Sequence, residues 1–280
     1  MKYANLHLHS TYSDGGFTPY QLALIGKSLG YRALSLTDHE TDGGTAEFFR
    51  ACEGEGLDAL TGAEFYGAHD GHCPHIVGLD FDPDEPALRA FIRERCELQA
   101  ECTKKRVERG IRLGFIRDFC WNDVLDYCRE GAWICIDHVV GAMKRKGVMP
   151  PEDNGDALRQ NVFKGAEALA FEAPHPGAER VIGIIRRAGG IAVLAHPVNR
   201  MRYVPELVGY GLNGIEVSHP DVDAKTAAEA RAAAKAFDLY RCGGTDHTGA
   251  MSCCGGKNAV PALQGVTEEE YRAIRERRPC

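Results

Sequence analysis

The sequence predicts an α/β fold in which a parallel sheet closes into a barrel and carries a small inserted helical domain. Two observations lead to this prediction. Short apolar segments alternate with helical segments over residues 1–85 and again over 171–280, and this alternation is typical of a parallel sheet. Residues 86–170 between them are charged and helical, with at most one short strand at Ala132–Ile136. We therefore expect a barrel formed by 1–85 and 171–280 and a helical insertion formed by 86–170.

The first part of the predicted barrel alternates strands with helices. Strand-like segments are Tyr3–Leu8, Ala33–Thr37, Asp58–Phe65 and His75–Leu79. A helix is expected from Thr18-Pro19 to Leu29, because proline favours the start of a helix and Gly30 follows its end. A second helix is expected over Thr45–Glu55.

The insertion and the second part of the barrel follow in the chain. Helical patterns in the insertion lie at Leu88–Gly110, Asn122–Glu130, Val139–Lys146 and Asn154–Phe163. The barrel then resumes with helices at Ala178–Ala188 and Ala224–Phe237 and with strands at Ile191–Ala195, Gly214–Val217 and Leu239–Gly243.

Composition limits the class of protein. The net charge of −7 argues against long nucleic acid as a partner, although local metal ions can still attract a small anionic substrate. The 11 cysteines include no CxxC pair, which predicts reduced thiols rather than a disulfide framework. No apolar run is long enough to cross a membrane, and the N-terminal segment has no signal-peptide core. We therefore expect a cytoplasmic protein with no membrane partner.

Histidines and carboxylates gather at the ends of the predicted strands, where barrel enzymes place their active sites. His7 and His9 end the first strand, and because residues i and i+2 point to one face, both imidazoles can bind one ion. The others, in chain order, are Asp14, Asp38, His39, Glu64, His75, His196, Glu216, His219, Asp246 and His247. Buried ionisable groups are costly when unpaired, and shared divalent cations would pair with them. Imidazole and carboxylate ligands together suit Mn, Zn or Fe.

Taken in order, these motifs resemble the PHP (polymerase and histidinol phosphatase) family of the amidohydrolase superfamily. The matching segments are NLHLHSTYSDGGFTP, ALSLTDHET, TGAEF, HIVGLD, IAVLAHP, GIEVSHP and GGTDHTG. The resemblance implies a distorted (β/α)7 barrel with two or three divalent ions. The implied ligands of the first ion are His7, His9, Glu64 and Asp246. Glu64 would bridge to a second ion held by His75 and by His138 of the insertion, and Asp14 and His39 would hold a third.

The sequence departs from the family pattern at two places. A histidine two positions after Asp246 should complete the third ion site, but Thr248 stands there and His247 lies one position early. Either His247 binds the third ion or that site is weak or empty. The family's Arg-Pro-His is Ile136-Asp137-His138 here, so one phosphate-binding arginine is missing. Basic residues that can replace it are Lys144, Arg145, Lys146, Arg200 and Arg202.

The resemblance implies a metal-dependent phosphoesterase acting on a small phosphorylated metabolite. The substrate would be a sugar or nucleotide phosphate monoester or a small cyclic phosphodiester. Hydroxide held between two ions would attack the phosphorus, with Glu64 as the bridging carboxylate. His196 and His219 are candidates to protonate the leaving oxygen, as is His247 if it is not a ligand. Two other classes stay open: a non-catalytic metal-binding PHP module, and a hydrolase of a non-phosphate ester or amide.

Overall fold

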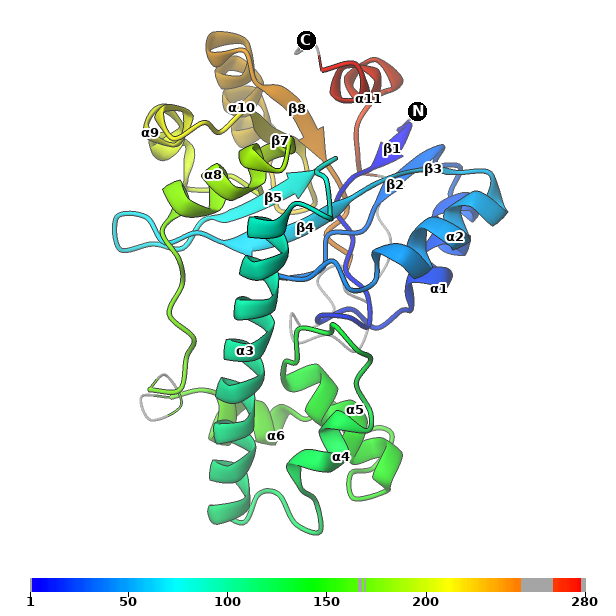
Figure 1. Ribbon diagram of the computed structural model, residues 1–280, viewed down its shortest axis with the longest axis vertical. Coiled ribbons are helices and arrows are strands. Elements are labelled where there is room, and N and C mark those ends of the chain that lie inside the picture. Colours follow the sequence, from blue (N-terminus) through cyan, green and yellow to red (C-terminus); the bar gives the residue numbers. More distant parts are fainter. Residues whose placement is uncertain (1, 166–167, 169, 248–263, 278–280) are drawn as a thin grey trace.

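Two β-sheets form the α/β part of the computed structural model, which describes residues 2–165, 168, 170–247 and 264–277 (Figure 1). A parallel sheet has the order β1-β2-β3, and a mixed sheet has the order β4-β5-β6-β7-β8. The first contains β1 (Ala4–Asn5), β2 (Ala33–Ser35) and β3 (Asp58–Leu60). The second contains β4 (Gly62–Tyr66), β5 (His75–Leu79), β6 (Ile191–Leu194), β7 (Gly214–Ser218) and β8 (Tyr240–Gly243).

The prediction of an α/β fold is confirmed, whereas the closed (β/α)7 barrel is not found among the described residues. The two sheets are connected by isolated bridges. Leu8 pairs with His247, and His39 pairs with Glu64, both in parallel. These bridges bring the ends of β1, β2, β4 and β8 together at one place.

The predicted strand Asp58–Phe65 is divided between the two sheets. Its first part, β3, pairs with β2, and its second part, β4, pairs with β5. Gly62 opens β4 because a Cβ atom there would collide with the hydroxyl of Ser35 and the carbonyl of Leu36. A strand that lies this close to its neighbour has no room for a larger residue.

The prediction of an all-parallel sheet is wrong for β5, which runs antiparallel to both β4 and β6. Only residues 67–74 connect β4 to β5. Parallel neighbours need a crossover of a dozen or more residues, whereas antiparallel neighbours can be joined by a short turn. The other pairings, β1-β2, β2-β3, β6-β7 and β7-β8, are parallel as predicted.

Helices cover the outer faces of both sheets. α1 (Pro19–Ser28) begins at Thr18, whose side chain caps the helix together with Gln21, and it packs with α2 (Thr45–Glu55) beside β1–β3. The helices that follow the insertion are α8 (Ala178–Arg187), α9 (Val204–Gly209), α10 (Ala224–Phe237) and α11 (Glu268–Arg275). Buried side chains of α8 such as Ile182 and Ile185 pack against the mixed sheet in the largest apolar core.

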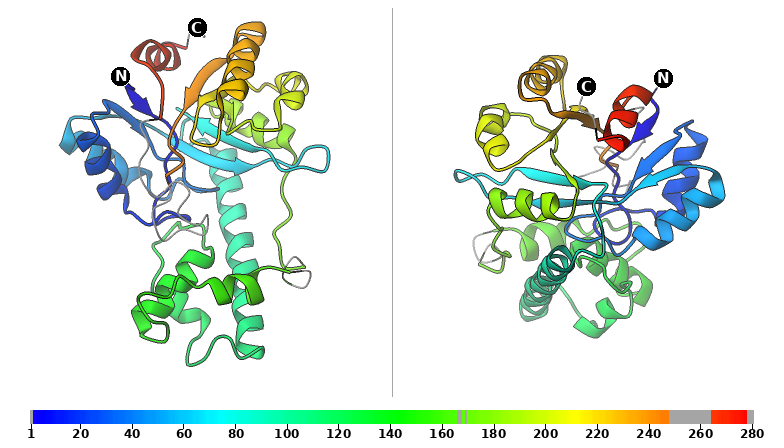
Figure 2. Two further views of the ribbon diagram at one scale, coloured as in Figure 1. Left: turned by 180° about the vertical axis from the view of Figure 1, so that it is seen from behind. Right: turned by 45° about the horizontal axis from the view of Figure 1, so that its top comes forward.

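The helical segment between β5 and β6 projects from the α/β part (Figures 1 and 2). It contains α3 (Pro86–Arg112), α4 (Trp121–Leu125), α5 (Ile136–Lys146), α6 (Asp156–Leu158) and the π-helix η1 (Arg159–Phe163). These helices share a separate core that includes Val107, Ile116 and Met143. The possible strand at Ala132–Ile136 is not formed: residues 132–135 have no regular secondary structure, and Ile136 begins α5. No helix in the described part of the chain has the length and apolar character needed to cross a membrane.

Candidate metal centre

The predicted ligands meet where the ends of the two sheets approach each other. His7 and His9 follow β1, His39 follows β2, and Glu64 lies in β4. His75 stands at the start of β5 rather than at its end. Because β5 runs antiparallel to β4, with Tyr66 opposite His75, its start lies at the same edge as the other ligands. The direction of this one strand thus brings His75 into the group.

Glu64 is the centre of the cluster and is only 1% exposed. Its Oε2 atom lies 3.4 Å from His7 Nε2, 3.3 Å from His9 Nε2 and 3.2 Å from His39 Nδ1. Asp246 Oδ1 lies 3.0 Å from His9 Nε2 and 3.6 Å from His7 Nε2. His7, His9, Glu64 and Asp246 therefore offer four ligand atoms around one point.

The other oxygen of Glu64 faces a second set of imidazoles. Its Oε1 atom lies 3.0 Å from His75 Nδ1 and 3.0 Å from His196 Nε2. His39 is also within reach of this group. A carboxylate with one oxygen in each of two ligand sets has the geometry of a bridging ligand.

The buried ring nitrogens fit divalent cations. His7 Nε2, His9 Nε2 and His39 Nδ1 are buried and make no hydrogen bond. Burying a polar atom without a partner costs free energy, and a cation bound by these nitrogens and Glu64 would remove that cost. Burial also lowers the pKa of His39 well below its ordinary value, despite the opposing charge of Glu64. His39 is therefore neutral, which is the state that binds a metal.

Glu216 orients His7, a role that was not predicted from the sequence. Its Oε1 atom lies 2.8 Å from His7 Nδ1, and its Oε2 atom accepts the backbone N–H of His196 at 2.6 Å. Burial alone would raise the pKa of Glu216, but the neighbouring His7 lowers it below its ordinary value, so the carboxylate is ionised. The hydrogen bond assigns the His7 proton to Nδ1 and leaves Nε2 to face the cluster, as in many metal-binding histidines. The feature of the sequence that could have indicated this role of Glu216 was a carboxylate inside a strand expected to be buried.

His219, a predicted catalytic residue, contacts Asp246. Its Nδ1 atom accepts the backbone N–H of Asp221 at 3.0 Å, so its proton is on Nε2. Nε2 then donates to Asp246 Oδ2 at 3.2 Å. The observed geometry makes His219 a partner that orients Asp246.

A loop held by Asp38 positions Asp14. The Asp38 carboxylate accepts hydrogen bonds from Ser10 N at 2.7 Å, from Ser10 Oγ at 2.6 Å and from Ser13 Oγ at 2.5 Å. Asp14 Oδ1 consequently lies 3.6 Å from His9 Nδ1, and its Oδ2 lies 3.8 Å from His39 Nε2. His9, Asp14 and His39 form a third set of atoms that could hold an ion.

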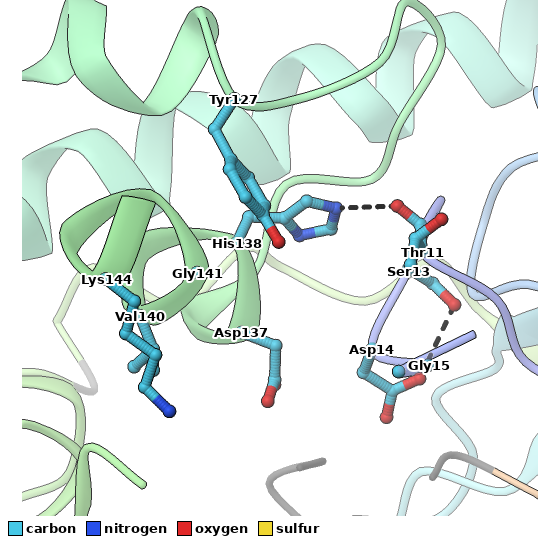
Figure 3. Close-up of a pocket in the computed structure, with 11 residues that line it drawn as sticks. Thr11, Ser13, Asp14, Gly15, Tyr127, Asp137, His138, Val140, Gly141 and Lys144 are labelled. Atoms are coloured by element: carbon cyan, nitrogen blue, oxygen red, sulfur yellow. Dashed lines mark hydrogen bonds between the residues drawn. The ribbon is translucent and has the colours of Figure 1, made fainter. Parts of the chain in front are cut away.

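His138, the predicted ligand from the insertion, does not lie in any of these sets. Its Nδ1 accepts the backbone N–H of Cys135 at 3.2 Å, which leaves the proton on Nε2. Nε2 donates to the carbonyl of Thr11 at 3.2 Å (Figure 3). Since both nitrogens are engaged in hydrogen bonds, His138 connects α5 to the loop that bears Asp14. His196 stands beside Glu64 and His75, where His138 was predicted.

His247 is also placed away from the predicted third ion. Its ring stacks on Phe17, with ring centroids 5.4 Å apart, and it lines a small cavity with Leu22 and Leu34. Asp246 points to the cluster, with Oδ1 3.0 Å from His9 Nε2, whereas the ring of His247 contacts Phe17. The φ of Asp246 is +47°, so the backbone turns between these two side chains. Thr248 lies outside the described residues.

Two cavities border the cluster, and both include Asp14 and Asp137. One, of about 200 Å³, lies between the Asp14 loop and α5 and is lined by Lys144 and Tyr127 (Figure 3). The other, of about 250 Å³, reaches His39. Its basic and aromatic lining residues are Tyr66, Arg106, Trp133, Arg159, Phe163 and Lys164.

Of the predicted phosphate-binding residues, Lys144 alone lines either of these two cavities. Arg145 lies over the ring of Tyr127, and Lys146 pairs with Asp123 at 2.7 Å. Arg200 contacts the carbonyl of Val198, and Arg202 contacts His72 and Tyr203. The sequence did not indicate Arg106, Arg159 or Lys164, because the basic residues of a charged helical segment cannot be told apart by role until the segment is folded.

Comparison with known proteins gives consistent matches. The PHP domain profile matches residues 5–186. The chain is 28% identical over 249 residues to phosphoribosyl 1,2-cyclic phosphate 1,2-diphosphodiesterase of Eggerthella lenta, covering 88% of this chain and 94% of that protein. It is 30% identical over 198 residues to 3′,5′-nucleoside bisphosphate phosphatase of Chromobacterium violaceum, covering 69% and 66%.

Two further comparisons cover most of the chain. A 5′-3′ exoribonuclease of Haemophilus influenzae is 28% identical over 255 residues, covering 86% of this chain and 88% of that protein. Among solved structures, a protein of Bifidobacterium adolescentis predicted to be a metal-dependent phosphoesterase superposes with a TM-score of 0.81 at 26% identity. That superposition covers 99% of this chain and 96% of the other.

Proposed function

Since this chain belongs to the PHP domain family and is a hydrolase of phosphate esters, we propose that its substrate is a small phosphorylated metabolite bound beside two or three divalent ions. The observation that carries the proposal is Glu64, whose two oxygens face two separate sets of imidazoles at 3.0–3.4 Å. When bound, such ions neutralise phosphoryl charge and acidify water, which supplies a nucleophile near neutral pH.

In this proposal some side chains hold the ions and others orient those ligands. His7, His9, Glu64 and Asp246 hold the first ion; His75 and His196 hold the second together with Glu64; and Asp14 and His39 offer a third position. Glu216 and His219 orient the ligands through hydrogen bonds to His7 and Asp246. His196 is assigned as a ligand in place of His138, because its Nε2 faces the same Glu64 oxygen as His75.

The cavities support a small anionic substrate. The cavity beside His39 combines Arg106 and Lys164 with the ring of Trp133, and Lys144 lines the cavity on the other side of Asp14. Cations suit phosphate oxygens, and an aromatic ring suits a sugar or a base. Volumes of about 200 and 250 Å³ lie just below the usual range of small-molecule sites, which begins at about 300 Å³, and therefore favour a small substrate. A phosphate monoester and a small cyclic phosphodiester both meet these requirements.

The test combines metal content with phosphate release. Elemental analysis is made on the purified chain, and turnover is measured on sugar and nucleotide monoesters, 3′,5′-bisphosphates, cyclic diesters and short RNA. We expect two or three ions per chain, loss of turnover with a chelator, and activity on monoesters or cyclic diesters. Glu64→Gln should lose both ions and turnover, while Glu206→Gln, at a half-exposed position beside His69, should behave as the parent.

Each outcome of this test has a definite meaning. Turnover of RNA with no turnover of the small esters would refute the small-metabolite proposal in favour of the activity named for the Haemophilus influenzae relative. A Glu64→Gln protein with full metal content and full turnover would refute the bridging role. Carboxyl-ester or amide hydrolysis without phosphate release would refute the phosphate chemistry.

A further inference from the structure

A buried ion pair joins the helical segment to the residue that follows His39. Arg95 of α3 is 3% exposed and Glu40 is 1% exposed. Arg95 Nε lies 3.0 Å from each carboxylate oxygen of Glu40. The neighbouring Cys96 Sγ lies 3.6 Å from the Glu40 carbonyl, so two successive residues of α3 hold Glu40.

Glu40 has an unusual backbone conformation directly beside a proposed metal ligand. Its φ of +49° is in the left-handed region, which costs free energy for a residue with a Cβ atom. Its N–H donates to the carbonyl of Glu64 at 2.7 Å, next to the bridge between His39 and Glu64. Glu40 is therefore held by Glu64 through its N–H and by Arg95 through its carboxylate, directly beside His39.

Arg95 also holds the segment by which the chain returns from the helices to the sheet. Its Nη1 donates to the carbonyl of Pro174 at 2.7 Å. The next residue, His175, packs on Tyr66 with ring centroids 4.8 Å apart, and Tyr66 stacks on His39 at 5.2 Å and 14°. The Arg95 guanidinium thus contacts the two chain segments that border His39.

We propose that Arg95 is a positioning residue, which acts through Glu40 to fix His39 against Glu64. A buried ion pair adds little stability over an apolar pair of the same size, because both charges lose their hydration. The pair is better explained by the geometry that it imposes on Glu40. This inference rests on the proposed binding of an ion by His39 and is independent of which phosphate ester is hydrolysed.

A double-mutant cycle with metal affinity as its readout tests the inference. Zn²⁺ or Mn²⁺ is titrated calorimetrically into the metal-free parent, Arg95→Met, His39→Ala and the double variant, each checked for folding by circular dichroism. We expect Arg95→Met to weaken binding about tenfold, as partners of metal ligands commonly do. In the double variant the effects should not multiply, because both changes disturb the same ligand.

Two variants serve as controls. Arg180→Met removes a half-exposed ion pair with Glu94 of α3, in which the charged atoms lie 3.0 Å apart. This variant should bind metal as the parent does. If Arg95→Met does not fold, Glu40→Gln and Arg95→Lys replace it, since each keeps the approximate shape and removes part of the pairing. We expect the same non-multiplying loss of affinity from Glu40→Gln and a smaller one from Arg95→Lys.

The outcomes separate this inference from the proposed function. Normal metal affinity in Arg95→Met and Glu40→Gln, with weak binding in His39→Ala, would overturn the positioning role while leaving His39 as a ligand. Effects that multiply would likewise overturn it, because Arg95 would then act independently of His39. Normal affinity in His39→Ala would overturn the assignment of His39 as a ligand, and the inference with it.

Discussion

Replacing Glu216 with glutamine should weaken metal binding although Glu216 is not itself a proposed ligand. The carboxylate accepts from two donors, His7 Nδ1 at 2.8 Å and the backbone N–H of His196 at 2.6 Å. A glutamine side chain offers one carbonyl oxygen and one NH2 group. One of the two donors must therefore face the NH2 group of the glutamine, and the position is buried, since Glu216 is only 2% exposed.

The magnitude follows from these contacts. If the amide oxygen stays with His196, the proton of His7 is no longer held on Nδ1, and the Nε2 lone pair that faces Glu64 is no longer favoured. Hydrogen bonds to a charged group contribute about 1.5–3 kcal/mol. A loss in that range corresponds to about 10- to 100-fold in metal affinity, the effect usual for residues that orient metal-binding histidines.

Isothermal titration of the metal-free protein with Zn²⁺ measures the change directly. Thermal unfolding of the metal-free variant is the companion measurement, because a fold that fails would also bind metal poorly. We expect a folded Glu216→Gln protein with a Kd raised at least tenfold. An unchanged Kd in the folded variant would refute the argument that Glu216 sets the His7 tautomer. The matched control is Glu206→Gln, a half-exposed glutamate beside His69.

Three further predictions test the site. His138→Ala should leave the metal content unchanged and lower the unfolding free energy by about 1–3 kcal/mol, because two hydrogen bonds are lost. His196→Ala should instead lower the metal content. Elemental analysis and thermal unfolding distinguish the two variants. Metal affinity should fall as pH decreases from 8 to 6. Burial lowers the pKa of His7 and His9, but the neighbouring carboxylates outweigh burial and raise both pKa values well above the ordinary value in the metal-free protein, so protons compete with the ion. A pH-independent Kd would contradict this prediction. Arg106→Met should raise KM about tenfold or more at unchanged metal content, since a charged contact to phosphate is lost; an unchanged KM for the best substrate would exclude Arg106 from the binding site.

The sequence was sufficient to predict most of the α/β elements and the residue types of the metal cluster. Strand periodicity is a local property, so the placement of His7 and His9 on one face follows from their spacing. Helix ends are local as well: Thr18 caps the start of α1, and Gly56, with a left-handed φ of +65°, ends α2. The ends of the predicted strands indicated Glu64, His75 and Asp246, the resemblance assigned them to ions, and these residues do converge in the structure.

The tertiary structure decided which histidines lie beside Glu64. His138 and His196 both lie in segments that resemble family motifs. The hydrogen bonds of His138 to Cys135 and Thr11, however, depend on how α5 packs against the Asp14 loop. The short β4–β5 connection likewise decided the direction of β5, and with it the place of His75.

The pairing of Glu216 with His7 joins residues 209 positions apart, and that of Arg95 with Glu40 joins residues 55 positions apart. No local pattern encodes such contacts, because they arise only when the sheet order and the helical insertion bring distant segments together. The sequence by itself therefore determined the chemistry available to the site. The fold determined which atoms point into it, because the orientation of a ring depends on hydrogen-bond partners that only tertiary packing supplies.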